Sequence, residues 1–359
     1  MTMMKSKIND KYKVDPAVRK FHEETIIADL HADTWMWEAF LGYNIRKRHR
    51  SFIPRNPFFN HIDVPRAREG GLNITGQGVV VNTLRKRNYL QRGKNMTERI
   101  LRGIERNSDE LELVTSATHA REAVSRDKIG VFLGVEGAHI LEGKLEALDY
   151  FYNQGVSYFT LGHFNENEAV FTSNDLPNVA KSLKPFGKEL VRKLEKKKIM
   201  VDIAHVAPGC VRDIMEIVTR PVIASHIGMK GVFDHWRNLD DGQLRAVAES
   251  GGVIGIMFQP HFLTNKFWRC ELDTVVAHIE HCLEVAGEDH VALGSDFDGL
   301  ITTPDGLTDI SKLPILTQRL FHRGHSSRVL RKFLGENFLR VFKQVCGSEE
   351  EISEKKTVN

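Results

Sequence analysis

The sequence predicts an α/β fold, a (β/α)8 TIM barrel, and three observations support this prediction. With 359 residues, the chain has a length at which barrels of this class form one domain. Short apolar runs rich in β-branched residues alternate with helical patterns, as they do in parallel βα units. Eight such runs occur, the number that closes a barrel, and their nearly continuous apolar character is typical of strands buried on both faces.

The expected strands follow one another along most of the chain. They are residues 26–33, 78–82, 129–136, 157–163, 199–205, 222–226, 253–258 and 291–296. Helices between them are marked by their ends, since Asp240 or Asp241 caps a helix that Gly251 and Gly252 terminate. Pro221 separates a helix around 211–218 from the strand that follows it.

The chain is expected to have three parts. Residues 1–20 form an N-terminal extension, 21–347 a single barrel domain with its metal site at the C-terminal ends of the strands, and 348–359 a charged tail. Residues 40–60 are basic and aromatic and lack clean periodicity, which predicts a long loop after the first strand. Loops at that end of a barrel usually build the pocket.

Composition indicates no macromolecular partner. Fifty Lys and Arg against 47 Asp and Glu leave a net charge of +3, too little to imply nucleic acid or an anionic membrane. No segment is long and apolar enough for a spanning helix, and residues 1–20 lack the features of a secretory signal. The cysteines, which are Cys210, Cys270, Cys282 and Cys346, show no paired spacing, which favours a reducing compartment. We therefore expect a cytoplasmic protein and leave a homodimer open.

Titratable residues fall at the ends of the expected strands. They are His31 with Asp33, Glu136, His163, His205, His226 and Asp296. One such residue beside an apolar run is more often a hydrogen-bonded structural residue than a ligand. In a (β/α)8 barrel, however, the C-terminal strand ends converge on one mouth, where the active sites of such barrels lie. Six strands that present these groups to one place predict an active site there.

The buried carboxylates of this set require positive charge nearby. An unpaired buried carboxylate costs several kcal/mol, and no strand end in the set offers Lys or Arg. Imidazole and carboxylate together suit zinc, whereas the lack of nearby thiolates disfavours a closed structural zinc site. The sequence therefore predicts a catalytic metal site.

The number of ligands favours two ions that share one carboxylate, because an open catalytic zinc usually takes three protein ligands and a water. His31 and Asp33 lie two residues apart on a strand, so both face the same side and would hold one ion. His205 and His226 would hold the second ion, with Glu136 between them in barrel order as the bridge. A hydroxide between two such ions is nucleophilic at neutral pH, because metals lower the pKa of water from about 15.7 to about 7. Metal-assisted hydrolysis is the expected reaction class.

Ten short stretches of the sequence carry a resemblance to a known family. They are DLHADT at 29–34, IDVPRAREGGL at 62–72, GVEGAH at 134–139, YFTLGHFNEN at 158–167, VDIAHV at 201–206, PVIASH at 221–226, RNLDDGQL at 237–244, GGVIGIMF at 251–258, LGSDFDG at 293–299 and GENFLRVF at 335–342. In order and spacing they resemble the renal (membrane) dipeptidase family of zinc metallopeptidases, in the amidohydrolase-like superfamily. The resemblance extends over about residues 27–342.

The resemblance implies a (β/α)8 fold, two Zn²⁺ per chain and hydrolysis of dipeptides, including those with a C-terminal D-residue. Its metal ligands, carried over by matching motif, are the set that the ligand count indicates: His31 and Asp33, the bridging Glu136, and His205 with His226. A small dipeptide is thus the expected partner.

The resemblance also implies three roles in the reaction. Asp296 would take a proton from the attacking water and deliver it to the leaving amine. His163 would polarise the scissile carbonyl and stabilise the oxyanion, and Arg237 would hold the substrate carboxylate, for which its planar fork is suited. Residues 164–175 are more acidic than the family pattern, and we expect this loop to border the substrate amino group.

Other residues near these motifs have structural interpretations. His139 is expected in a loop or behind the ligands, and Asp298, two after Asp296, is expected to be structural. His278 and His281 lie with Cys282 on a helical pattern, which is typical of a packed or solvated face. For Arg237, the alternative to a role in substrate binding is that it is a surface charge near Asp234 and Asp240.

Two rival functions remain open at this stage. One is a different hydrolysis on the same metal framework, such as deamination or the cleavage of N-acyl amino acids, lactones or cyclic amides. The opening motif, His-x-Asp at 31–33 and not the His-x-His usual in those relatives, disfavours it. The other is a metal-binding protein without turnover, which predicts a missing ligand or acid/base residue.

Overall fold

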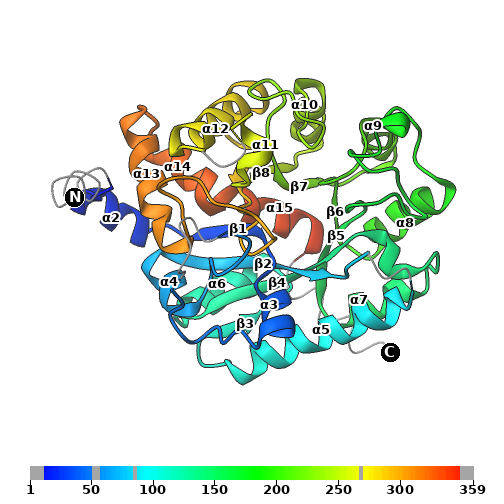
Figure 1. Cartoon of the computed structure of the whole chain (residues 1–359), viewed down its shortest axis with the longest axis horizontal. Helices are drawn as coiled ribbons and strands as arrows, with labels where there is room; N and C mark the ends of the chain where they lie inside the picture. Colours follow the sequence, from blue (N-terminus) through cyan, green and yellow to red (C-terminus); the bar gives the residue numbers. More distant parts are fainter. Residues whose placement is uncertain (1–11, 51–56, 84–86, 267–269, 348–359) are drawn as a thin grey trace.

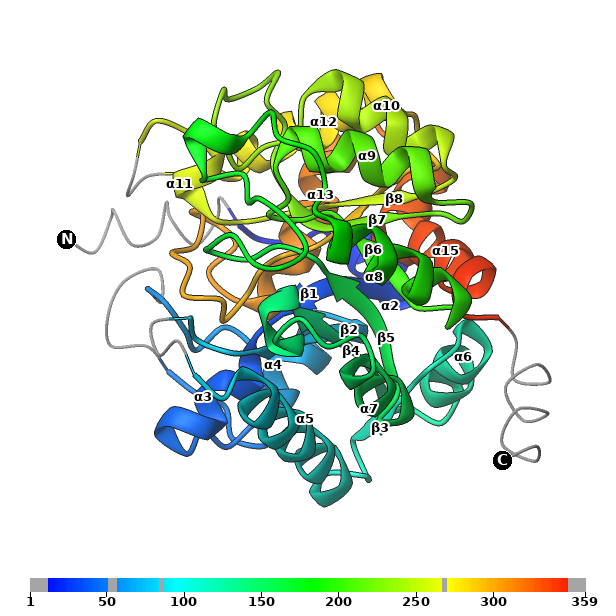
Figure 2. The same cartoon turned by 90° about the vertical axis from the view of Figure 1, so that its right-hand side faces the viewer.

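Parallel strands close into a barrel that helices surround (Figures 1 and 2). The computed structural model describes residues 12–50, 57–83, 87–266 and 270–347. Its barrel strands are β1 Ile27–Ala32, β2 Leu72–Val80, β4 Ile129–Glu136, β5 Val156–Thr160, β6 Met200–Asp202, β7 Ile223–Ile227, β8 Val253–Ile256 and β9 Val291–Leu293. They pair in chain order, β2 with β4 and β9 back to β1, so that the predicted (β/α)8 barrel is confirmed.

The strands differ from the prediction in three ways. The second strand begins at Leu72 and not at residue 78. Its first six residues, LNITGQ, mix apolar with polar residues and glycine, and because they lack an apolar run the sequence pattern does not indicate a strand there. A short strand, β3 Leu111–Leu113, was not predicted and pairs with the start of β4. Several strands also end before their predicted last residue, so that His163, His205 and Asp296 lie in the loops that follow.

Helices cover the outside of the barrel and alternate with its strands. They are α2 Pro16–Glu23, α3 Thr34–Leu41, α4 Val64–Glu69, α5 Tyr89–Arg106, α6 Ala117–Ser125, α7 Ala147–Asn153, α8 Pro185–Lys196, α9 Pro208–Ile217, α10 Asp241–Glu249, α11 Pro260–Leu263, α12 Leu272–Ala286, α13 Leu313–His322, α14 Ser327–Arg331 and α15 Asn337–Cys346. The predicted start of α10 is confirmed, since Asp240 and Gln243 form a reciprocal capping box there.

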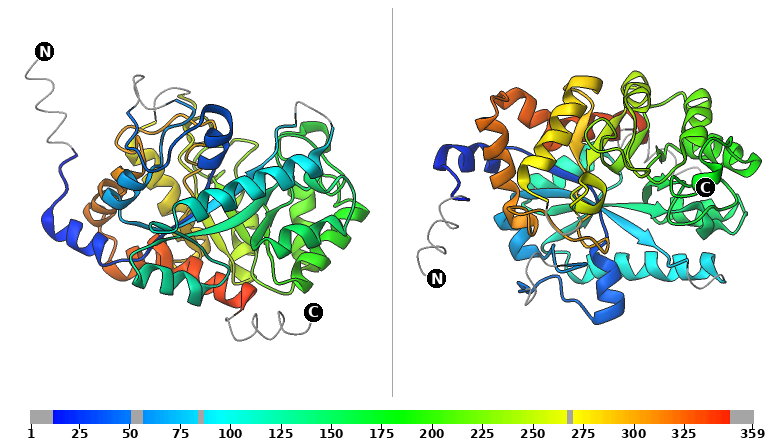
Figure 3. Two further views of the ribbon diagram at one scale, coloured as in Figure 1. Left: turned by 90° about the horizontal axis from the view of Figure 1, so that it is seen from below. Right: turned by 45° about the horizontal axis from the view of Figure 1, so that its top comes forward.

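One apolar cluster fills the barrel near the starts of its strands. Each of the eight barrel strands contributes to it, with Ala28, Ile74, Phe132, Tyr158, Met200, Ile223, Val253 and Ala292. Helix α15, which lies beside α6 in the left view of Figure 3, adds Phe338 and Phe342 to the same cluster. Phe338 stacks on Phe132 with ring centroids 4.6 Å apart. This end of the barrel is therefore apolar and packed, which leaves the C-terminal strand ends for polar groups.

The segment expected as a long loop at 40–60 is only partly irregular. Helix α3 extends to Leu41, and residues 51–56 lie outside the described residues. The end of this loop is held by Asp298, whose carboxylate accepts hydrogen bonds from the backbone of His61 at 2.7 Å and from the Thr34 hydroxyl at 2.7 Å. Asp298, in the loop after β9, thus joins the start of α3 to the segment before α4 at the mouth of the barrel, which is the structural role expected of it.

Helix α2 docks on the outside of the barrel beside α13 (Figure 1). It begins at Pro16, five residues before the expected domain boundary at residue 21. His22 is buried at its end, with Nδ1 2.8 Å from the Thr317 hydroxyl and Nε2 2.7 Å from the carbonyl oxygen of Gly70. The cysteines, too, are buried and present as thiols. Among the residues that the structure describes, no helix has both the length and the apolar composition to cross a bilayer.

Acidification is expected to weaken the fold through His22. Burial lowers the pKa of His22 from 6.5 to about 4, so the unfolded chain binds a proton between these values that the folded chain does not bind. Stability from this group is present above pH 6.5 and is lost as the pH falls toward 4. When the pH is lowered from 7 to 5, the free energy of unfolding, measured by urea denaturation, should fall by about 2 kcal/mol more in the wild type than in His22→Leu. The control His322→Leu, at an exposed position of α13, should match the wild type, and an equal loss in both variants would contradict the assignment.

Candidate metal centre

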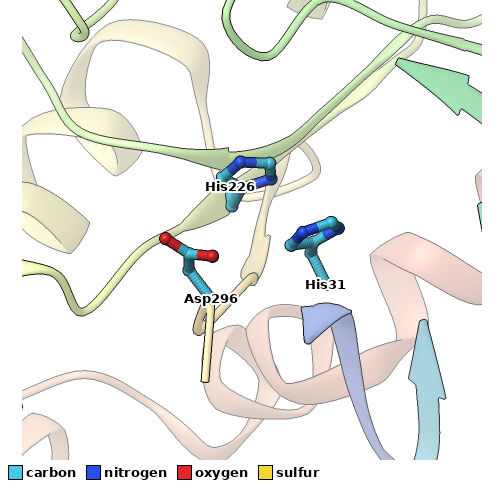
Figure 4. A group of neighbouring side chains, drawn as sticks. All are labelled: His31, His226 and Asp296. Carbon is cyan, nitrogen blue, oxygen red and sulfur yellow. The ribbon is translucent and has the colours of Figure 1, made fainter. Parts of the chain in front are cut away.

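The predicted site residues gather at one end of the barrel. His31, Glu136 and His226 lie on β1, β4 and β7, and the others lie in the loops directly after their strands. The gathered residues are His31, Asp33, Glu136, His163, His205, His226, Arg237 and Asp296. Figure 4 shows three of them, from β1, β7 and the loop after β9, whose side chains converge on one space. The structure thus brings these side chains together from separate strands and the loops that follow them.

The Glu136 carboxylate lies at the centre of this group. Its Oε1 is 3.6 Å from His31 Nε2, 3.3 Å from His205 Nε2 and 3.5 Å from His226 Nε2. Its Oε2 is 3.4 Å from His163 Nε2. A single carboxylate therefore faces imidazole nitrogens from four strands, which is the placement expected of a bridging ligand.

His31 and Asp33 form one side of the centre. His31 Nε2 is 3.5 Å from Asp33 Oδ1, and neither atom has a hydrogen-bond partner within the described residues. The other ring nitrogen of His31, Nδ1, lies 2.8 Å from the buried Tyr158 hydroxyl. Glycines make room for this arrangement: a Cβ at Gly134 would lie 1.9 Å from the Tyr158 ring, and a Cβ at Gly78 2.2 Å from Asp33 Oδ1. The orphaned atoms, both buried, point at one place and fit a metal ion.

His205 and His226 form the other side. Their Nε2 atoms are only 2.9 Å apart, and both lie within 3.5 Å of Glu136 Oε1. Two imidazole nitrogens at this distance repel one another unless a proton or a cation lies between them. The His226 ring also stacks on His31, with centroids 4.1 Å apart (Figure 4). These three atoms fit a second ion that shares Glu136 with the first.

The ionisable groups show that the site is short of positive charge. Burial, with a further contribution from Asp33, raises the pKa of Glu136 well above 4.5 and that of Asp296 to about 8. Burial alone would lower the pKa of His31, but the Asp33 and Glu136 carboxylates raise it to about 10. The raised pKa values of Glu136, Asp296 and His31 mean that bound protons offset the negative charge of the carboxylates. Divalent ions would supply that charge, and the mixed imidazole and carboxylate donors suit zinc.

Arg237 lies beside this centre and not on the surface, so the alternative of a surface charge near Asp234 and Asp240 is wrong. Its side chain is buried, and Nη2 donates to the carbonyl oxygen of His226 at 2.9 Å. Within the described part of the chain, Nε and Nη1 have no partner, and burial lowers the pKa of the guanidinium to about 10. Two N–H groups of a buried, charged guanidinium are therefore available for an anion.

A cavity of about 140 Å³ is lined by Arg237 and by several of the candidate metal ligands. A water occupies about 30 Å³ in the liquid, so this cavity has room for a few waters or one small molecule. Its polar lining includes Asp33, Glu136, His163, His205, Arg237 and Asp296. Phe164 and Asn174 line both this cavity and a second one of about 500 Å³, which the acidic loop at 164–175 lines.

The backbone is strained at two of these residues. His205 and Asp296 have φ of 64° and 61°, in the left-handed region that residues other than glycine rarely adopt. Such strain persists where the surrounding structure over-determines it, and it is common at functional sites. Each side chain is turned into the mouth in the loop directly after its strand.

Residues given structural interpretations keep them. His139 Nε2 lies 3.0 Å from the carbonyl oxygen of Val81, behind His163. His278 is buried in α12, where Nδ1 accepts from the backbone N–H of Met229 at 2.8 Å, and His281 pairs with Asp241 at the surface. None of these histidines belongs to a cluster of ligand atoms that the described residues form.

Several residues that hold the site were missed from sequence. Tyr158 contacts His31, Ser225 contacts His226, and the buried Asp202 and Asp29 tie their strands to Ser225 and Ser295. A signal existed for the aspartates, since each lies on an apolar strand two or three residues before a predicted ligand. Their partners lie far away in the chain, so sequence alone did not connect them.

Comparison with known proteins places the chain among peptidases. A sequence model of the membrane dipeptidase family, peptidase family M19, matches residues 16–356. An uncharacterised dipeptidase of Schizosaccharomyces pombe is 37% identical over 219 residues, which are 61% of this chain and 54% of that protein. The chain thus spans about half the length of this curated relative.

Solved structures share the fold. The probable dipeptidase PvdM from Pseudomonas aeruginosa is similar with a TM-score of 0.80 at 19% identity, over 92% of this chain and 98% of that chain. A metallopeptidase from Rhodobacter sphaeroides, liganded with a phosphinate mimic of the dipeptide L-Ala-D-Ala, is similar with a TM-score of 0.77 at 22% identity, over 89% and 99%. At these identities the likeness shows the barrel fold alone.

Zinc is expected to bind at two sites per chain and to stabilise the fold. After metal removal by a chelator, calorimetric titration with Zn²⁺ should give two equivalents, and Tm should rise by about 5 °C at 100 times Kd, because the ions bind only the folded chain. Glu136→Gln removes the shared carboxylate and should weaken both sites. His281→Gln, at the surface, should bind zinc as the wild type does. Equal uptake by Glu136→Gln and the wild type, or none by either, would contradict the assignment.

Proposed function

The chain belongs to the membrane dipeptidase family, peptidase family M19, and from that premise we propose that it hydrolyses the peptide bond of dipeptides at a centre of two zinc ions. The first ion would be held by His31 and Asp33, the second by His205 and His226, with Glu136 shared. The orphaned buried atoms of His31, Asp33 and Glu136 support this assignment. When bound, zinc supplies a water of lowered pKa and a Lewis acid for the carbonyl.

The observation that carries the proposal is the buried Arg237 fork beside the metal-binding residues. Arg237 lines a cavity of about 140 Å³ together with Glu136 and Asp296, and its Nε and Nη1 have no partner among the described residues. The charged N–H donors of a guanidinium suit the oxygens of a carboxylate. A substrate with a free carboxylate close to its scissile bond would place the carboxylate at Arg237 and the bond at the candidate ligands, and a dipeptide is the simplest such molecule.

Asp296 and His163 are assigned to the chemistry by their positions. Asp296, which lines the same cavity, would accept a proton from the attacking water and return it to the leaving amine. Burial and the charges of His139, His31 and Arg237 lower the pKa of His163 well below 6.5, so the ring is neutral. A neutral imidazole donates one hydrogen bond, which suits it to polarise the scissile carbonyl without adding a charge.

Substrate range and location are the finer parts of the proposal. The metallopeptidase from Rhodobacter sphaeroides that shares this fold is liganded with a mimic of L-Ala-D-Ala, which supports acceptance of a C-terminal D-residue. The acidic loop at 164–175 would lie toward the substrate amino group, since Phe164 and Asn174 border the cavity. We propose a cytoplasmic location, which the buried thiols of the cysteines favour.

Asp296→Asn should separate proton transfer from metal binding. The amide keeps the shape of the carboxylate but cannot accept the proton, so kcat should fall by about 10²-fold or more. Metal analysis should still give the wild-type zinc content, and near-UV circular dichroism should be unchanged. Asp234→Asn, which changes an exposed carboxylate outside the cavity, is the matched control. Full turnover by the Asp296 variant would remove Asp296 from this role.

Arg237→Met should lower kcat/KM only for substrates with a free carboxylate. For an L,L- and an L,D-dipeptide, kcat/KM should fall on the order of 10²-fold, because a charge-assisted contact with the substrate carboxylate is lost. For the C-terminal amides of the same dipeptides, the wild type and the variant should be similar.

The assay set for this variant also includes N-acyl amino acids, lactones and cyclic amides. Preference of the wild type for one of these over every dipeptide would favour the rival hydrolysis. Normal zinc content without turnover of any compound would favour a metal-binding protein. Equal losses on dipeptides and their amides would contradict the role of Arg237.

A further inference from the structure

A chain of hydrogen bonds runs from Asp202 on β6 through Ser225 to His226 on β7. The Ser225 hydroxyl lies 2.6 Å from Asp202 Oδ2 and 2.8 Å from His226 Nδ1. All three side chains are buried, with exposed fractions of 0%, 0% and 1%. The chain of hydrogen bonds is closed to bulk solvent, and the hydrogen atoms assigned to it are those of these groups and their protein neighbours.

The surroundings of Asp202 settle the direction of each bond. Its Oδ1 accepts from the backbone N–H of Ser225 at 2.9 Å and from that of Ala204 at 3.1 Å. Its Oδ2 accepts from the hydroxyls of Ser225 at 2.6 Å and Thr160 at 2.5 Å. Four donors on two oxygens leave no place for a hydrogen on the carboxylate, so Asp202 acts only as an acceptor.

The single hydrogen of the Ser225 hydroxyl is therefore used toward Asp202. The hydroxyl oxygen can then only accept from His226, which requires a hydrogen on His226 Nδ1. His226 Nε2 carries the lone pair in that tautomer, and it faces Glu136 Oε1 at 3.5 Å and His205 Nε2 at 2.9 Å. The short distance between the two Nε2 atoms also requires one of them to lack a hydrogen.

We propose that Asp202 is a positioning residue that, through Ser225, holds His226 in the tautomer and orientation in which Nε2 binds metal. This inference rests on the metal centre of the proposed function. When one ring nitrogen of a histidine binds metal, the hydrogen-bond partner of the other nitrogen commonly determines the tautomer of the ring. Here the carboxylate does not contact the histidine but acts through an intervening hydroxyl.

The chain also contains a matched control, at Asp29 and Ser295. The Ser295 hydroxyl and backbone N–H donate to the Asp29 carboxylate, as those of Ser225 donate to Asp202. The Ser295 oxygen, however, accepts from the backbone N–H of Phe297 at 3.1 Å and not from a histidine. Ser295→Ala therefore removes a comparable tie between strands without changing the partner of a histidine.

Two variants test the inference by different routes. Ser225→Ala removes the acceptor of the His226 Nδ1 hydrogen. Asp202→Asn keeps the size of the side chain, but the amide nitrogen would donate to the Ser225 oxygen in place of accepting from it. The Ser225 hydrogen would then turn toward His226, which reverses the tautomer and places a hydrogen on Nε2.

Each variant is characterised by two measurements on the full chain. Competition with a chromophoric chelator gives the zinc affinity, which should fall about 10- to 100-fold in Ser225→Ala and Asp202→Asn and by less than about threefold in Ser295→Ala. Nitrogen-15 NMR of the metal-free protein, labelled at histidine, should show His226 with its hydrogen on Nδ1 in the wild type and on Nε2 in Asp202→Asn.

The outcomes separate this inference from the proposed function. Wild-type zinc affinity and an unchanged tautomer in Asp202→Asn would overturn the role of Asp202, even if the enzyme is active. Failure of the wild type to bind zinc would contradict the metal centre, and the tautomer would still be measured on the same sample. If neither variant folds, a hydrogen on Nε2 of His226 in the metal-free wild type would overturn the inference.

Discussion

The structure of the barrel mouth depends on one buried carboxylate. Glu136 lies at the end of β4 with imidazole nitrogens of four histidines within 3.6 Å of its two oxygens. Burial and the neighbouring Asp33 make its charge unfavourable, as the raised pKa of Glu136 shows. A carboxylate in this position is stable when cations share it, and the surrounding nitrogen and oxygen atoms are placed to hold them. The charge requirement of Glu136 thus links the fold to the proposed chemistry.

The barrel separates stability from function along its axis. One apolar residue from every barrel strand packs with α15 at one end, while the polar side chains occupy the other. The buried Asp29 and Asp202 lie between these two regions, and each ties its strand to a serine directly before a site residue. These ties hold Asp296, whose backbone is strained, and His226, on β7, against neighbouring strands, so that both side chains are held in fixed positions.

The barrel could be predicted, and the candidate ligands could be named, because both leave short-range signals. A buried parallel strand is an apolar run, and a titratable residue at its end stands out against that run. The start of β2 lacked this contrast, since Asn73 and Gln77 interrupt its apolar residues. The left-handed backbone of His205 and the contact of Tyr158 with His31 arise only when strands from distant parts of the chain meet. The partner of Asp202 lies on the next strand and leaves no mark in the local pattern.

The shared role of Glu136 is tested most directly by diffraction from crystals of the zinc-loaded protein, recorded on both sides of the zinc absorption edge. Two anomalous peaks should lie next to the Glu136 carboxylate, one toward His31 and Asp33 and the other toward His205 and His226. Peaks that lie away from Glu136, or their absence from crystals whose protein contains zinc by elemental analysis, would contradict the shared metal centre.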